Sequence, residues 1–157
     1  MYKRRGLAQE CRNELYGTAS SKLLNKLQSK QNQLLKVLYN KDWLYSTNAL
    51  HIECKLVKVR DLYEIRILSF VRKCLKKETI PLFHNYYTYQ HSQHDHDTRR
   101  SLDLVIPRPR TDSGATRVQT AGSKLWNCNE TAKEYMNFSM DTFKHKLKDY
   151  FISSYGS

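Results

Sequence analysis

Acidic side chains are the first candidates for catalysis, because two-metal phosphoryl transfer requires carboxylates that converge on ions about 4 Å apart. The sequence holds 15 Asp and Glu residues but contains no Asp-Asp pair. The closest grouping is Asp95 with Asp97, which alternate with histidines in a polar segment. We therefore predict no catalytic residues and no enzymatic activity, with a metal-dependent enzyme as a distant alternative.

Three histidines near those aspartates are the weak metal candidates of the chain: His91, His94 and His96. Neutral imidazole suits zinc and copper, but a solvated polar loop explains the same pattern, and we favour the loop. His51 and Cys54 are three residues apart and lack a second pair at metal-site spacing. We expect neither a metal nor a cofactor.

Basic side chains offer the stronger chemistry. Lys22, Lys26 and Lys30 recur at every fourth residue, a row that can neutralise successive phosphates and release their counterions. Arginine beside aromatic rings is typical of proteins that hold single strands without reading their sequence. The remaining candidates for nucleic-acid binding are Tyr86, Tyr87, Arg99, Arg100, Arg108, Arg110 and Arg117. The competing interpretation is that the lysines are merely solvated and the tyrosines belong to the core.

Composition favours the same partners. Lys and Arg total 27 against 15 acidic residues, a net charge of +12 over 157 residues, which attracts polyanions such as RNA or DNA. A hydrophobic share of 39% is compatible with one folded domain. No run of about 18 apolar residues is present, so we expect no membrane span. Without a secretory signal, we predict reduced thiols and a location in the nucleus or cytoplasm.

The elements that must position these residues are mainly helical. The clearest helix covers residues 21–39, where leucines at helical spacing form one face, interrupted by Gln31, which needs a hydrogen-bond partner if buried. A short helix through Cys54, a central helix over 59–77 and a last helix from near Ser139 should follow. The leucines of the first face are Leu23, Leu24, Leu27, Leu34, Leu35 and Leu38.

One small β-hairpin is predicted near residues 102–121. Residues 102–106 have the composition of a strand. Residues 116–121 show a weak alternation of polar and apolar residues, which is compatible with a second, returning strand. Trp43 and Trp126 are expected as core anchors. The fold class is therefore a mainly α, single domain of three to five helices with that hairpin, flanked by a basic tail over 1–14 and a short tail over 153–157.

Several blocks of the chain resemble the region that follows the polymerase in non-LTR retrotransposon proteins of the jockey-like kind. The first blocks are Leu15-Tyr16-Gly17 and Leu27-Gln28-x-x-Gln31-Asn32, followed by Leu50-His51-x-Glu53. Later ones are Pro81-Leu82-Phe83, Gly122-Ser123-Lys124-Leu125-Trp126-Asn127 and Phe143-Lys144-x-x-Leu147. The resemblance covers residues 15–152. Tyr16 replaces the usual Trp, and Cys128-Asn129 replaces the usual Leu-Pro.

The resemblance implies a non-catalytic accessory domain or fragment of an RNA-directed DNA polymerase, whose polymerase domain is absent from this chain. It would hold RNA or DNA non-specifically through phosphate contacts. The alternative is a structural module that packs on the polymerase or self-associates. The expected structural residues are Gln31, Trp126, Asn127 and Phe143.

Overall fold

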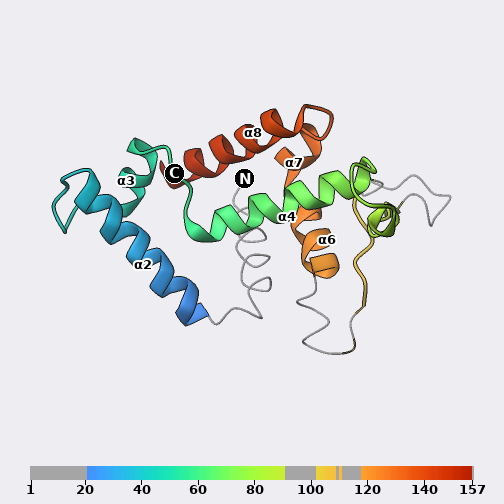
Figure 1. The fold of residues 1–157 in the computed structure, drawn as a ribbon, viewed down its shortest axis with the longest axis horizontal. Coiled ribbons are helices and arrows are strands. Elements are labelled where there is room, and N and C mark those ends of the chain that lie inside the picture. The colour runs from blue at the N-terminus through green and yellow to red at the C-terminus, as the bar shows by residue number, and fades with distance from the viewer. Residues whose placement is uncertain (1–20, 91–101, 109, 111–117, 157) are drawn as a thin grey trace.

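The computed structural model describes residues 21–90, 102–108, 110 and 118–156, and this part of the chain is mainly helical, as predicted. Figure 1 shows a long central helix crossed by shorter ones. Two 3-10 turns, η1 (Pro81–Phe83) and η3 (Ser154–Gly156), accompany the helices. The α-helices are α2 (Ser21–Leu38), α3 (Thr47–Glu53), α4 (Val59–Leu75), α6 (Val118–Cys128), α7 (Glu130–Glu134) and α8 (Met140–Ser153).

The core is built around α4, which confirms the predicted central helix. Ile65, Ile67, Leu68 and Val71 are buried on more than one side of α4, so the helix must pack against several neighbours. Its main partners are α6 and α8, which lie along different sides of α4 in Figure 1. The remaining large core side chains come from those partners: Leu125, Trp126, Phe143, Leu147 and Phe151.

Side-chain caps explain where three helices begin. The hydroxyl of Ser46 accepts a hydrogen bond from the Ala49 N–H at the start of α3, and Ser139 does the same for Thr142 at the start of α8. Asn129 accepts from the Ala132 N–H and opens α7. The predicted short second helix and the last helix from near Ser139 are thus confirmed.

The predicted β-hairpin is wrong. Within the described residues, Tyr89 and Leu104 form one isolated antiparallel bridge, and no longer pairing occurs there. The expected return strand fails because residues 118–121 are the first turn of α6, whose buried Ala121 and Leu125 follow helical spacing. The side chain of Asn127 substitutes for a paired strand: its amide accepts from the Leu104 N–H at 2.7 Å and donates to the Leu104 carbonyl at 2.9 Å.

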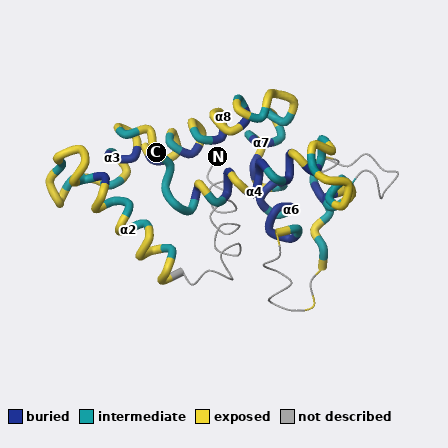
Figure 2. Tube along the Cα trace, in the orientation of Figure 1, coloured by how far each residue is buried: buried dark blue, intermediate teal, exposed yellow. Residues whose placement is uncertain are grey.

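The leucine face predicted for residues 21–39 lies on α2, and it is only partly buried. Leu35 is buried, whereas Leu23, Leu27, Leu34 and Leu38 are exposed. Figure 2 shows the contrast between α2, largely exposed or intermediate, and the buried centres of α4 and α6. The helix is turned so that several amide side chains, rather than the centre of the leucine face, point toward α3 and α4.

Three further expectations require correction. Trp43 is 79% exposed in the loop after α2 and is not a core anchor. The predicted tail over 153–157 does not hold for its described part, because Tyr155 is buried and its hydroxyl donates to Asp61. Cys54 and Cys74 are free thiols as expected, but Cys128 is disulfide-bonded.

None of the described helices combines the length and apolar character needed to cross a membrane.

Candidate nucleic-acid interface

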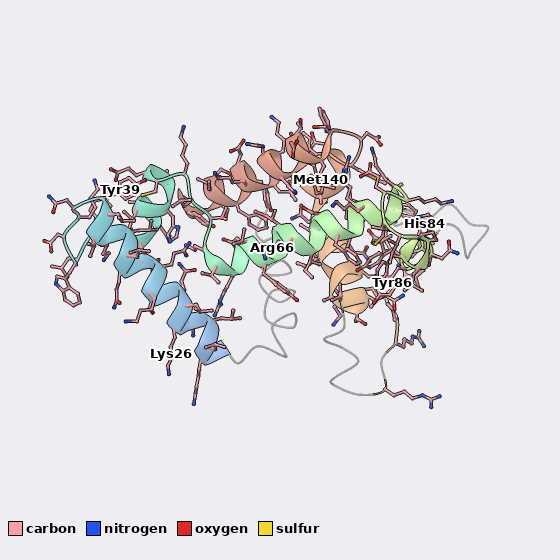
Figure 3. All side chains as sticks on the ribbon, viewed as in Figure 1. Lys26, Tyr39, Arg66, His84, Tyr86 and Met140 are labelled. Atoms are coloured by element: carbon pink, nitrogen blue, oxygen red, sulfur yellow. The ribbon has the colours of Figure 1, made fainter. Side chains whose placement is uncertain are left out.

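The lysine row of α2 is exposed along its length. Lys22, Lys26 and Lys30 all lie on the surface, and the helix contains no acidic residue to neutralise them. Lys30 donates to the Gln33 side chain at 3.2 Å. Figure 3 places Lys26 on the N-terminal half of α2. The structure therefore brings this predicted set together on one helix, as the sequence spacing required.

A network of amide side chains fixes the orientation of α2 and so determines which side carries the lysines. Gln28 Oε1 accepts from the Val59 N–H at 2.9 Å and supplies a partner at the start of α4. Gln31 Nε2 donates to the Val57 carbonyl at 3.1 Å, so the hydrogen-bond partner expected for Gln31 is present, although it lies on the loop that enters α4 and not on a helix. Gln28 also donates to Gln31 and to Asn32 within α2.

His51 closes this network from α3. The ring is fully buried, and its Nδ1 lies 2.9 Å from the Leu56 carbonyl oxygen, which can only accept. Its Nε2 lies 2.9 Å from Asn32 Oδ1 and 3.3 Å from Gln28 Nε2. Burial lowers the pKa of His51, and the positive charge of Lys58 acts in the same direction. The predicted roles of His51 did not include this one, because a lone histidine in a sequence carries no signal of its packing.

A polar pocket of about 340 Å³ lies beside the network. Four elements contribute to it: α2, α3, the start of α4 and η3. Asp61 is buried at its edge and accepts from Tyr155, while Lys58 Nζ donates to Asn48 Oδ1 at 2.7 Å. The lining side chains largely hydrogen-bond to one another, so the pocket is part of the polar contact between α2 and the elements α3, α4 and η3.

A second basic surface lies along α4, and the sequence analysis did not identify it. A groove of about 370 Å³ has an apolar floor that includes Leu62 and Phe70, with cationic side chains from two helices at its edges. Those cations are Arg66, Lys73 and Lys144. Figure 3 shows Arg66 midway along α4. None of the described residues that line the groove is acidic, so an anionic ligand would meet attraction from these three cations.

Among the described residues, the predicted arginines and tyrosines do not form a stacking site. Arg108 and Arg110 are exposed, whereas Arg99, Arg100 and Arg117 lie outside the described residues. Tyr87 is buried, its hydroxyl donates to the Val118 carbonyl at 2.9 Å, and burial raises its pKa.

Tyr86 is partly buried and packs against the core. Its ring packs edge-to-face against Phe83 and Tyr87 at 5.4 and 5.3 Å. Because Tyr87 is buried and the ring of Tyr86 contacts neighbouring aromatic rings, their interpretation as base-stacking residues is wrong for Tyr87 and has no support for Tyr86.

The expected structural residues do have structural roles. Trp126 and Phe143 are both within 1% of complete burial, and Asn127 holds the backbone of Leu104. Arg72, which the sequence places among the basic residues ending α4, is buried as well. Its guanidinium donates to the carbonyls of Met136 and Phe138, so this cation supports the turn between α7 and α8 and does not face solvent.

The described residues contain no group of three His, Cys, Asp or Glu side chains arranged to hold a metal ion. The weak candidates His91, His94 and His96 lie outside those residues. Searches for related proteins give no match to a protein-family model, a curated protein or a solved structure. The resemblance to retrotransposon proteins consequently stays a prediction.

Proposed function

We propose that this chain is a non-catalytic nucleic-acid-binding domain that holds RNA or DNA through phosphate contacts. The observation that carries the proposal is the exposed row of Lys22, Lys26 and Lys30 on a helix without acidic residues. Successive lysines in the row are four residues apart, which corresponds to about 6 Å along the helix axis. A row with this spacing can contact several phosphates of one strand.

The proposed binding is non-specific. Phosphate contacts fix a protein on a nucleic acid but carry no direct sequence information, which comes from contacts with base edges. Tyr87 is buried in the core and Tyr86 packs against it, so charge is the main source of affinity in this proposal. The net charge of +12 and the cationic groove along α4 support the same conclusion.

The proposed biological setting is a retrotransposon RNA-directed DNA polymerase, with this chain as the accessory region beyond the polymerase. Residues from separate blocks of the resemblance support it, because Gln28, Gln31, Asn32 and His51 form one hydrogen-bond network. In that setting the bound nucleic acid is template RNA or target DNA, and the polymerase domain is a partner supplied outside this chain.

A second candidate function is that of an interaction module. The supporting observation is the exposure of large apolar side chains along α2, because extensive exposed apolar patches in monomeric proteins commonly mark interaction sites. This candidate predicts self-association or binding to another protein, and it does not require nucleic acid.

Replacing Lys22, Lys26 and Lys30 together with Gln tests the first proposal. Affinity for a fluorescent single-stranded RNA and for a DNA duplex should fall for all sequences alike, because these lysines would bind phosphates. The slope of log affinity against log salt should decrease by about 0.7 to 0.9 for each phosphate that the variant no longer neutralises.

A matched variant separates the position of the charges from their number. Replacing the exposed lysines Lys55, Lys77 and Lys146 with Gln removes the same three charges from other parts of the surface. If both triple variants lose affinity equally, overall charge and not the α2 row is responsible. Unchanged affinity in the α2 variant would exclude that helix from the interface.

A further inference from the structure

The outward side of α2 has the spacing of a coiled-coil seam. Leu23, Leu27, Lys30, Leu34 and Val37 follow one another at intervals of four, three, four and three residues. This alternation averages 3.5 residues, the period that keeps side chains along one side of a helix facing a partner helix. We call these five residues the outer seam.

The outer seam is exposed along its full length. The exposed fractions of its apolar members are 55% for Leu23, 48% for Leu27, 59% for Leu34 and 78% for Val37. The opposite side of α2 is the one attached to the molecule, through Gln28, Asn32 and Leu35. The helix therefore uses amide hydrogen bonds for its attachment and presents most of its large apolar side chains outward.

The charge of α2 limits what can cover the seam. Lys30 lies within the seam, Lys26 lies beside it, and the helix has no acidic residue. If two copies of α2 paired over the full seam, parallel or antiparallel, Lys30 would lie close to Lys30 of the other copy. Like charges at such a position oppose pairing, so a second copy is a poor occupant.

A nucleic acid also fits the seam poorly, because phosphates offer nothing that buries leucine side chains. Acidic side chains on an amphipathic helix satisfy both features, since its apolar side can cover the leucines while its carboxylates meet Lys26 and Lys30. We propose that the outer seam of α2 docks an acidic amphipathic helix of another protein. This inference rests on the second candidate function, for which it names the partner, and it does not depend on nucleic-acid binding.

A designed peptide pair tests this inference on the full chain. The acidic peptide has three heptads with Leu at a and d and Glu at e and g, and the second peptide has Lys in place of Glu. By fluorescence anisotropy, the acidic peptide should bind at least about tenfold more tightly than the basic one. Equal binding of the two peptides, or no binding of the acidic one, would overturn the proposal.

Two variants identify the surface that binds. Replacing Leu27 and Leu34 with Gln should weaken acidic-peptide binding at least about tenfold while RNA affinity persists, because the lysines remain. Matched replacement of Ile80 and Leu82, which are exposed on another part of the chain, should change neither affinity. If the Leu27 and Leu34 variant keeps its affinity for the acidic peptide, the seam is not the site.

Charge reversal gives a readout that general loss of stability would not produce. Replacing Lys26 and Lys30 with Glu should reverse the preference, so that the basic peptide binds more tightly than the acidic one. A retained preference for the acidic peptide would contradict the assigned role of these lysines. Sedimentation that shows a wild-type dimer, lost on replacing Leu27 and Leu34, would assign the seam to a second copy and overturn the proposal.

Discussion

Amide side chains take the place of backbone groups at three positions of this molecule. Gln28 accepts from the first N–H of α4, Gln31 donates to the Val57 carbonyl, and Asn127 pairs with both polar groups of Leu104. The need for a partner at Gln31 could be predicted because the residue interrupts a leucine face. Gln28 and Asn32 could not be identified in the same way, because polar residues beside an apolar face are usually solvated.

Gly122 provides a test at the scale of single residues. A Cβ at this position would lie 2.8 Å from Cγ2 of Val71 and closer still to the hydroxyl of Tyr87. Gly122→Ala should therefore lower the free energy of unfolding by about 1 to 2 kcal/mol, since overpacking outweighs the roughly 1 kcal/mol gain in helix propensity. Chemical denaturation measures the change.

A double-mutant cycle with Tyr87→Phe tests whether the Tyr87 hydroxyl causes the loss of stability in Gly122→Ala. Removing the hydroxyl relieves the closest approach, so the double variant should be less destabilised than the sum of the two single variants. Strict additivity would show that the Tyr87 hydroxyl is not what resists a larger residue at 122.

Among the elements, the helices with apolar residues around most of their circumference were predicted best. The centre of α4 buries Ile65, Leu68 and Val71, and no rotation of this helix would leave its apolar side chains exposed together. α2 is different, because two orientations compete: one buries the leucines and the other satisfies the amides. Hydropathy alone favours the first, and the structure adopts the second because those amides bond to the loop that enters α4.

The strand predicted after residue 115 shows a second limit. A short segment that alternates weakly is compatible with a strand or a helix, and packing decides between them. Here Ala121 and Leu125 pack on α4, while Ser123 donates to the Val105 carbonyl at 3.0 Å. Those contacts favour α6, so within the described part of the chain the only strand pairing of residues 102–106 is the single bridge to Tyr89.

The attachment of α2 should depend on pH through His51. Burial holds the pKa of His51 below its ordinary value of about 6.5, so the unfolded chain binds the proton more readily than the folded one. The stability that neutral His51 contributes is present above about pH 6.5 and is lost as the pH falls below that value. Lys58 and Asp61 act on the ring in opposite directions, with Asp61 favouring protonation.

Thermal or urea unfolding at about pH 7.5 and about pH 5.5 tests this expectation against His51→Gln. The wild type should lose more stability than the variant over that interval, since only the wild type carries the buried imidazole at this position. Equal losses would attribute the pH dependence to other groups.

At the scale of the whole molecule, charge dominates the surface. A net charge of +12 creates self-repulsion in the compact state, and a Debye length of about 10 Å at 0.1 M salt screens it only partly. Buried Arg72 shows that the net charge does not give the number of cations on the surface, because its guanidinium hydrogen-bonds to the turn after α7. The class of partner could thus be predicted from composition. Which cations are exposed and able to contact that partner could be distinguished from the buried ones only in the structure.

Added salt should therefore stabilise the free protein while it weakens RNA binding. Between about 0.05 M and about 0.5 M NaCl the melting temperature should rise, because screening reduces repulsion among the exposed cations. Calorimetry of the free chain measures this effect separately from binding. A melting temperature that falls with salt would mean that attractive ion pairs, such as Lys133 with Asp103 at 2.5 Å, outweigh the repulsion.

The hydrogen bonds between Asn127 and Leu104 limit where the exposed side chain of Arg108 can lie. Both backbone groups of Leu104 are bound to α6, and the carbonyl of the next residue, Val105, accepts from Ser123 of the same helix. Arg108 is three residues beyond Val105, so its Cα lies no farther than about 11 Å from the Cα of Val105. Whatever this arginine contacts must accordingly approach the α6 side of the protein, and Asn127→Ala should weaken this attachment without removing it, because the Ser123 bond to Val105 remains.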